Sequence, residues 1–128
     1  METLSENIAA RRARVRAYQE LFEGAGGLQL VPHPQGSASL TQVVRCLPRR
    51  GGRDLAAEVV AALDRSGYEV QGSYVPIHLL KNFTMCVWDH LPRADRVWAD
   101  LVEMPCEPDV SFAQVERIAA IVTAVIAS

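Results

Sequence analysis

The chain has 128 residues, 49% of them hydrophobic and 22% charged, which is the size and composition of one globular domain. Its formal net charge of −2 disfavours nucleic acid as a partner, and no apolar run is long enough to cross a bilayer or to resemble a secretion leader. Three widely spaced cysteines indicate reduced thiols, so we expect residues 1–128 to form a single cytoplasmic domain with neither membrane nor nucleic acid among its partners.

Four segments carry apolar residues at helical spacing, and each opens on a residue that favours the start of a helix. Serine, threonine and aspartate accept hydrogen bonds from the free amides of a first helical turn, and proline needs no amide partner there. The helix starts, in chain order, are Thr3 with Glu6, Asp54, Pro92, and Ser111 with Gln114. The third helix is expected to turn an apolar face with Val97 and Trp98 toward the core.

Short extended runs lie between these helices and predict the strands of a small sheet. In chain order they are residues 28–31, 40–47, 68–70 and 103–106. Residues 71–90 are predicted to be irregular, because Pro76 disfavours the interior of both a strand and a helix. The order of elements predicts an α+β fold, with a small antiparallel or mixed sheet of three to four strands and helices packed mainly on one face.

The segment GYEVQGSYVPIHL, residues 67–79, resembles a motif near the end of the DegT/DnrJ/StrS family of pyridoxal-phosphate-dependent aminotransferases. In that motif a glycine and a short strand precede His-Tyr-x-Pro-x-His, and the matching positions here are Ser73, Tyr74, Pro76 and His78. Residues 91–122 are similar to the closing helix, strand and last helix of the family, and residues 11–31 to the helix and strand that open its small domain. The resemblance implies a C-terminal small domain of a sugar or aminocyclitol aminotransferase, with a fold like the small domain of fold-type I aminotransferases.

The resemblance also implies that the catalytic lysine and the groups that hold the cofactor belong to a large domain, which has no counterpart in this sequence. Such an enzyme needs a lysine amine, a carboxylate beside the pyridine nitrogen and a phosphate cradle. The sequence has one lysine, Lys81, in the irregular segment, and its glycines at 24–27 follow a helix rather than open one. We therefore expect pyridoxal phosphate to be held by a partner subunit, and this chain to be inactive alone.

Tyr74, His78 and Ser73 are the candidate substrate-binding residues, because the resemblance places this loop at the mouth of the active site. A phenol and an imidazole there can form hydrogen bonds with the hydroxyls of a sugar or a cyclitol. Ser73 stands where the family often has a histidine, a change that bears on substrate contacts. The alternative is that Pro76 stiffens the loop and that Tyr74 and His78 only pack. No catalytic, cofactor-binding or metal-binding residue is predicted.

Other reactive side chains are expected to have ordinary structural roles. Lys81 is predicted to be a solvated amine, and the arginines of the first helix a solvated basic face. A zinc site is not predicted, because the sequence has no CxxC pair and no second histidine at ligand spacing; the residues considered were Cys46, Cys86, His90 and Cys106. Trp88 is the better candidate for an anchor at an interface.

Two hypotheses of function follow from the resemblance. In the first, the chain is the small subunit of a two-chain aminotransferase, and it completes the active site of a large-domain subunit. That enzyme transfers an amino group from glutamate or glutamine to a keto sugar, a cyclitol or a related carbonyl. In the second, the chain is a non-catalytic binding or regulatory module derived from such a domain. A self-sufficient enzyme that uses Lys81, and a fragment of a longer enzyme, are further alternatives.

Overall fold

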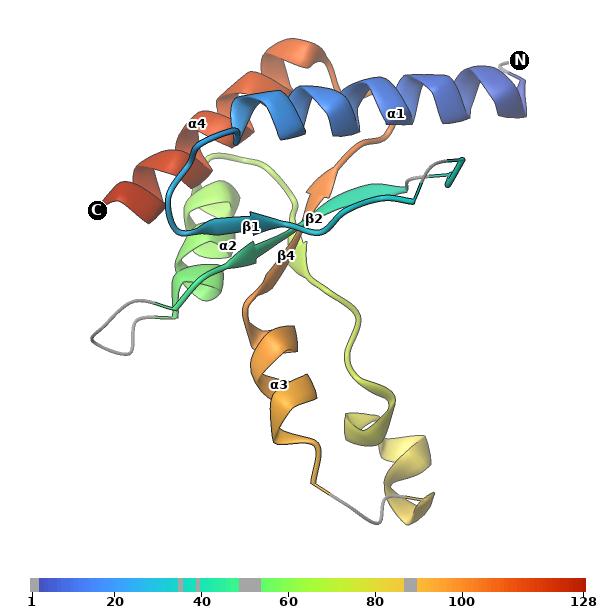
Figure 1. The fold of residues 1–128 in the computed structure, drawn as a ribbon, viewed down its shortest axis with the longest axis vertical. Helices are drawn as coiled ribbons and strands as arrows, with labels where there is room; N and C mark the ends of the chain where they lie inside the picture. Colours follow the sequence, from blue (N-terminus) through green and yellow to red (C-terminus); the bar gives the residue numbers. More distant parts are fainter. Residues whose placement is uncertain (1–2, 35, 39, 49–53, 87–89) are drawn as a thin grey trace.

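The computed structural model describes residues 3–34, 36–38, 40–48, 54–86 and 90–128. Four α-helices, four strands and two short 3-10 helices make up this part of the chain (Figure 1). In chain order they are α1 (Leu4–Leu21), β1 (Leu28–Leu30), β2 (Thr41–Cys46), α2 (Leu55–Arg65), β3 (Gln71–Gly72), η1 (Ile77–Leu79), η2 (Lys81–Cys86), α3 (Pro92–Ala99), β4 (Leu101–Pro105) and α4 (Phe112–Ala127).

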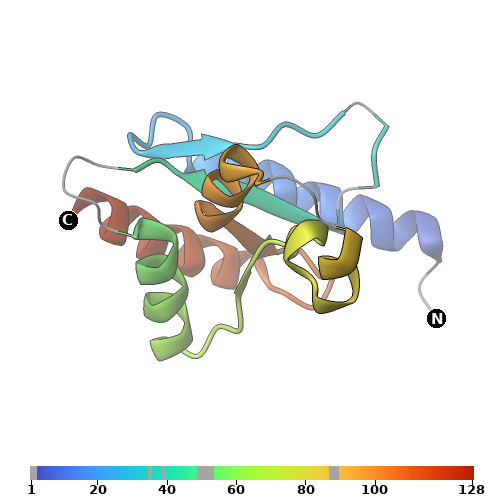
Figure 2. The same cartoon turned by 90° about the horizontal axis from the view of Figure 1, so that it is seen from below.

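The sheet is antiparallel throughout, with the strand order β1-β2-β4-β3. Along the two central strands, buried residues alternate with half-buried ones, since successive side chains point to opposite faces. Helices α1, α2 and α4 cover the face that carries the buried residues (Figures 1 and 2). This arrangement confirms the predicted α+β fold, with helices mainly on one face of a small sheet.

The hydrophobic core lies between the sheet and these three helices. Full burial of each large apolar side chain there contributes roughly 1.5–3 kcal/mol to stability. The largest fully buried apolar side chains are Tyr18, Val44, Val59, Leu63, Val102, Met104, Val115, Ile118, Val122 and Ile126. None of the helices in the described ranges combines the length and the apolar content that a membrane crossing requires.

The predicted helix starts are confirmed. At α1, the Thr3 hydroxyl accepts a hydrogen bond from the Glu6 amide at 3.3 Å, and the Glu6 carboxylate accepts one from the Thr3 amide at 2.7 Å. Ser111 and Gln114 form the same reciprocal pair at α4, with distances of 3.2 and 2.8 Å. Asp54 caps α2 through its side chain, 3.0 Å from a first-turn amide. Such caps fix helix starts because they satisfy amides that have no partner within the helix.

The third strand differs from the sequence prediction. Residues 68–70 were expected to pair, but β3 consists of Gln71 and Gly72, which pair with Glu103 and Val102 of β4. After α2, the Tyr68 amide is still bound to the carbonyl of Leu63 at 3.0 Å, so the chain reaches the sheet edge later than its composition suggests. The prediction for residues 68–70 is therefore wrong by position, although the strand exists.

The third helix is not part of the core. Residues 73–86 and 90–100, which we call the arm, project from the end of the sheet and carry η1, η2 and α3 (Figure 1). Helix α3 has no buried residue, and Val97 is 39% exposed. It packs along the outgoing limb of the arm instead, where the Trp98 indole is half-buried. The expectation of an entirely irregular segment over residues 71–90 is also wrong, because Pro76 begins the 3-10 turn of η1.

The arginines of α1 are a solvated basic face only in part, because Arg12 and Arg16 are exposed, Arg11 is half-buried and Arg14 is buried. Arg12 donates to the carbonyls of Gly36 and Ser37 at 2.7–3.0 Å, and Arg11 donates to the carbonyl of Leu40 at 2.9 Å. Arg14 is only 8% exposed and donates to carbonyls of the loop that precedes α4. A guanidinium has five N–H donors, so one side chain can satisfy several loop carbonyls. Arg11, Arg12 and Arg14 thus bind two loops to α1.

Candidate functional site

The candidate loop begins at Ser73, where the chain leaves β3 and enters the arm. The Ser73 hydroxyl donates to Oε1 of Glu103 in β4 at 3.0 Å. Its carbonyl accepts a hydrogen bond from Nε1 of Trp98 in α3 at 2.8 Å. Both partners come from elements that follow the loop in sequence. Ser73 is therefore fixed from two sides at the base of the arm.

His78 lies five residues further on, in η1. Its Nε2 atom is 2.6 Å from Oδ1 of Asp95 in α3, a short charge-assisted hydrogen bond. The histidine side chain is 15% exposed and the aspartate side chain 39% exposed. The imidazole is therefore partly covered and held by the returning limb of the arm.

Tyr74 differs from both neighbours. Its side chain is 87% exposed, although it lies between two residues that are bound within the chain. The alternative in which Tyr74 and His78 only pack agrees with the contact of His78 with Asp95, but the Tyr74 side chain is not packed. The phenol is the member of the predicted set that is open to a ligand or to a second polypeptide.

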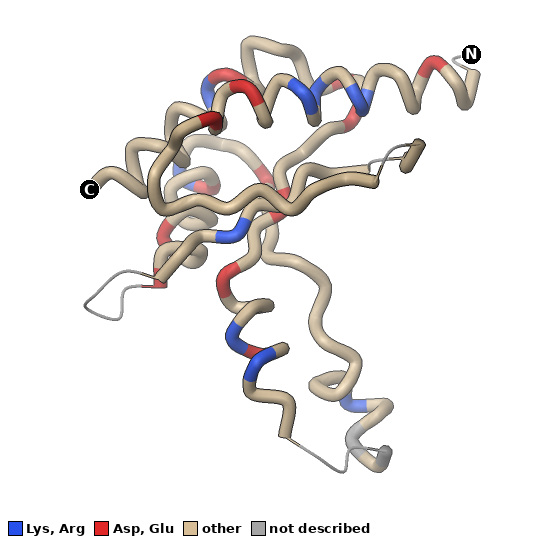
Figure 3. Tube along the Cα trace, viewed as in Figure 1, with Lys and Arg blue, Asp and Glu red and all other residues tan. Residues whose placement is uncertain are grey.

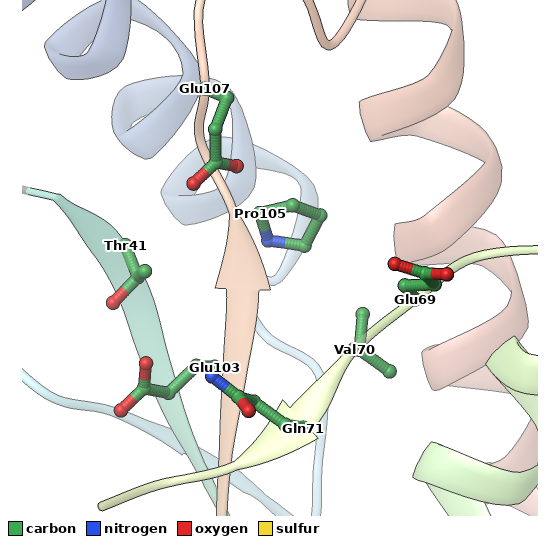
Figure 4. A pocket seen from close by; sticks show the side chains of 7 residues that line it. All are labelled: Thr41, Glu69, Val70, Gln71, Glu103, Pro105 and Glu107. Carbon is green, nitrogen blue, oxygen red and sulfur yellow. The ribbon is translucent and has the colours of Figure 1, made fainter.

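A cavity of about 350 Å³ lies beside Ser73, on the sheet face that the three core helices leave open (Figure 4). Its lining residues are Thr41, Glu69, Val70, Gln71, Glu103, Pro105 and Glu107. The Glu103 carboxylate joins it to the candidate loop through the Ser73 hydroxyl, and Glu107 lies 3.5 Å from Arg11. Three carboxylates favour hydroxyl or amine donors here and disfavour phosphate.

The described residues do not fit pyridoxal phosphate by themselves. Lys81 is exposed in η2 and does not line the cavity beside Glu103. The glycine-rich turn after α1 is not a phosphate cradle, because a Cβ on Gly27 would lie 2.7 Å from Cγ2 of Ile126. That glycine lies against a core side chain rather than against an open anion site. The turn ends a helix, as the sequence predicts.

The described cysteines, Cys46 and Cys106, are not in the reactive thiolate form near neutral pH. Burial raises the pKa of the Cys46 thiol and of the Cys106 thiol from 9.0 to about 11, so both stay protonated near neutral pH. Both are free thiols in the core. Over the described ranges, no three histidine, cysteine or acidic side chains gather closely enough to hold a metal ion. Trp88 and the side chain of Cys86 lie outside the described part of the chain.

Sequence reasoning missed the residues that hold the candidate loop. Asp95 and Trp98 stand three positions apart on α3, and Glu103 follows in β4. The signal for the first two was present, since residues at i and i+3 share one helix face. Their partners were not readable from the sequence, because the return of the chain along the arm brings them together.

The chain matches the model of the DegT/DnrJ/EryC1/StrS aminotransferase family over residues 1–123. No curated protein sequence matches it. Among solved structures, the aminotransferase TlmJ from Streptoalloteichus hindustanus superposes with a TM-score of 0.80 and 23% identity, over 97% of this chain and 33% of that one. S. venezuelae DesV, in complex with a ketimine intermediate, gives 0.81 and 24% over 98% and 33%. Helicobacter pylori PseC, an aminotransferase involved in the biosynthesis of pseudoaminic acid, gives 0.79 and 15% over 94% and 33%.

At these identities the solved structures show a shared fold. The chain spans about a third of the length of each of them. The family match, in contrast, covers nearly the whole described chain and includes the Ser73–His78 loop, the arm and both flanking strands. The chain therefore belongs to the DegT/DnrJ/EryC1/StrS aminotransferase family, as the motif in residues 67–79 predicted.

Proposed function

We propose that this chain is the small subunit of a two-chain aminotransferase, and that a separate large-domain polypeptide carries the catalytic lysine and pyridoxal phosphate. The observation that carries the proposal is family membership together with described residues that do not fit pyridoxal phosphate: Lys81 is exposed, and Gly27 lies against Ile126. The single lysine of the sequence is exposed on the arm, which agrees with a lysine supplied from elsewhere. When bound, the cofactor supplies the electron sink that amino transfer requires.

The arm is the proposed docking surface for that polypeptide. Large hydrophobic side chains that remain at least partly exposed are concentrated there: Tyr74, Val75, Ile77, Leu79, Leu80, Phe83, Met85, Leu91 and Val97. Figure 3 shows basic residues on α3 and η2 beside them, and Arg93 and Arg96 are exposed. Apolar surface with a charged rim is typical of a protein interface. A complementary partner has an apolar groove bordered by acidic residues.

In this proposal the amino acceptor lies against Tyr74, His78 and Ser73. Their phenol, imidazole and hydroxyl groups can form hydrogen bonds with a keto sugar, a cyclitol or a related carbonyl. The acidic cavity beside Ser73 also favours hydroxyl donors over phosphate. The amino donor is glutamate or glutamine. We place the enzyme in the cytoplasm, because the described cysteines are free thiols.

A non-catalytic module is the second candidate function. It is favoured by two contacts within the chain: the Ser73 hydroxyl is already bound to Glu103, and Nε2 of His78 is already bound to Asp95. A module of this kind binds a complete aminotransferase through the arm and alters its activity without touching the substrate.

Co-expression of the 128-residue chain with a large-domain polypeptide of the same genome tests the proposal. We expect the two to copurify, and amino transfer to keto sugars to require both. Full activity of the large-domain polypeptide alone favours the regulatory module, and failure to associate with any such polypeptide contradicts both functions.

Matched variants locate the docking surface. Ile77 and Met85 on the arm are 66% and 96% exposed, whereas Leu4, at the far end of α1, is 78% exposed. Replacement of Ile77 and Met85 by aspartate is expected to weaken association about tenfold or more, because buried anchors dominate interface affinity. Leu4→Asp makes a similar change away from the arm and leaves the association intact. Equal losses from both changes contradict docking through the arm.

A further inference from the structure

Helix α3 holds the candidate loop at both of its ends. Trp98 donates from its indole Nε1 to the carbonyl of Ser73 at 2.8 Å, and Asp95 accepts from the ring of His78 at 2.6 Å. Asp95 and Trp98 are three positions apart, so one helix face binds two points that are five residues apart on the loop. The Glu103 carboxylate adds a third contact, to the Ser73 hydroxyl at 3.0 Å.

These contacts leave Tyr74 as the exposed member of a fixed loop. Ser73 and His78 are half-buried, and the Tyr74 side chain between them is 87% exposed. Pro76 restricts the backbone of the same segment through its fixed φ, which is −54° here. A phenol on a loop held at both ends loses less conformational freedom on binding than one on a free loop.

The Asp95 contact also determines which nitrogen of His78 carries the proton. An ionised carboxylate can only accept hydrogen bonds, so the neutral imidazole bound to it through Nε2 must carry its proton on Nε2. The Nδ1 atom of the ring is then a hydrogen-bond acceptor. In the neutral ring, the atom that His78 has left for a ligand is Nδ1 with its lone pair, which suits a hydroxyl or amine donor and not a carbonyl oxygen.

We propose that Asp95 and Trp98 are positioning residues: they fix the loop that presents Tyr74, and Asp95 holds His78 as the Nε2–H tautomer, with Nδ1 free to accept from a hydroxyl of the amino acceptor. The role in acceptor binding rests on the proposed function. The tautomer and the fixed loop are properties of this chain and can be measured without a partner.

Nitrogen-15 NMR of the histidine rings in the 128-residue chain tests the tautomer. At alkaline pH, where histidine rings are neutral, we expect His78 to show a protonated Nε2 and an unprotonated Nδ1. Asp95→Asn keeps an acceptor oxygen and retains this pattern, whereas Asp95→Ala gives a mixture of tautomers. Asp64→Ala removes an exposed helical aspartate of α2 and is the matched control. A mixed or Nδ1–H tautomer in the unaltered chain overturns the proposal.

Trp98→Phe tests the other end of the loop. It keeps an aromatic ring and removes the donor to Ser73. The sequence has two tryptophans, so the variant also assigns the Trp98 indole resonance. We expect that N–H to exchange slowly with solvent in the unaltered chain, and the amide resonances of residues 73–78 to broaden or shift in the variant. Rapid indole exchange together with an unchanged loop spectrum contradicts the positioning role of Trp98.

Kinetics of the two-chain enzyme test the consequence for binding. Asp95→Ala is expected to raise the KM for the amino acceptor about tenfold with kcat nearly unchanged, since the loss of an oriented hydrogen bond is of that size, and Asp95→Asn restores most of the affinity. An unchanged KM overturns the proposal. If His78 has the expected tautomer but no large-domain polypeptide gives an active enzyme, the positioning role of Asp95 stands. Only the proposed function is then contradicted.

Discussion

Gly27 lies directly against Ile126: a Cβ at position 27 would be 2.7 Å from the Cγ2 atom of that isoleucine. The glycine has a φ of +89° and immediately precedes β1, and the isoleucine is in the last turn of α4 and is 2% exposed. The turn that ends α1 is therefore packed onto the C-terminal helix. Two requirements meet at this position, since the backbone is left-handed and there is no room for a side chain.

The three glycines of this turn predict a graded series of stability losses. Gly24 has a φ of +74°, but a Cβ there would have no other atom within 4 Å, and Gly26 has neither constraint. We expect Gly26→Ala to be neutral or slightly stabilising, Gly24→Ala to cost about 1 kcal/mol for the left-handed backbone, and Gly27→Ala to cost about 2–4 kcal/mol because steric overlap adds to it. Urea denaturation measures all three. Equal losses at positions 24 and 27 would contradict the close packing on Ile126.

Arg14 is predicted to be the most costly arginine of α1 to remove. Its guanidinium donates to the carbonyls of Pro108, Val110 and Ala10, and lies 5.3 Å from the centre of the Phe112 ring. Arg14→Ala removes the guanidinium donor from the carbonyls of Pro108 and Val110, and is expected to cost about 2–4 kcal/mol.

Arg14→Lys and Arg16→Ala are the controls for this effect. Lysine keeps the charge but lacks the planar set of donors of a guanidinium. Arg14→Lys is therefore expected to lower the free energy of unfolding by less than Arg14→Ala and by more than Arg16→Ala. Arg16 is exposed, and its replacement by alanine is expected to cost less than about 0.5 kcal/mol. Thermal denaturation ranks the three variants, and equal effects at positions 14 and 16 would show that the carbonyl contacts contribute little.

Stability is predicted to fall as the pH rises from about 9 to about 11. Burial raises the pKa of Cys46 and of Cys106 from 9.0 to about 11, so thiols that ionise in the unfolded chain stay protonated in the folded one. The unfolded state then binds fewer protons, and the free energy of unfolding decreases by up to about 1.4 kcal/mol per pH unit for each thiol. Below pH 9 this contribution to stability is fully present.

Urea denaturation under reducing conditions at pH 8.0 and 10.5 measures the decrease. Unfolding at alkaline pH releases one proton from each buried thiol. Cys46→Ala and Cys106→Ala are therefore each expected to lower the number of protons released by one, whatever they do to stability at pH 8.0. Burial also raises the pKa of the Tyr18 phenol, which adds a decrease of the same sign at higher pH and remains in both variants. A pH dependence that is the same in the cysteine variants and the unaltered chain would contradict the thiol contribution.

Tyr74 is predicted to affect binding without affecting stability. Its side chain is 87% exposed, so Tyr74→Ala should change the free energy of unfolding by less than about 0.5 kcal/mol. In the two-chain enzyme we expect it to raise the KM for the amino acceptor about tenfold, and Tyr74→Phe to show how much of that comes from the hydroxyl. Exposed Phe112, replaced by alanine, is a control away from the arm. An unchanged KM in Tyr74→Ala would exclude the phenol from the acceptor site.

The helices, most strands and the family could be predicted from the sequence because their signals are local. Thr3 with Glu6, and Ser111 with Gln114, are three residues apart and close their capping boxes within one turn. The β-branched residues within 40–47 likewise predicted a strand, which the structure forms as β2 (Thr41–Cys46). The motif around Tyr74 and His78 identified the family, which the match over residues 1–123 confirms.

The tertiary structure decided where these elements meet. Whether the apolar face of α3 enters the core or lines a projecting arm depends on the path of residues 73–100, and the same periodicity fits both outcomes. His78 and Asp95 are 17 positions apart, and Arg14 and Val110 are 96 apart. Pairings at such separations depend on chain geometry rather than on neighbouring residues, because many donors and acceptors compete for each partner until the fold brings one pair together.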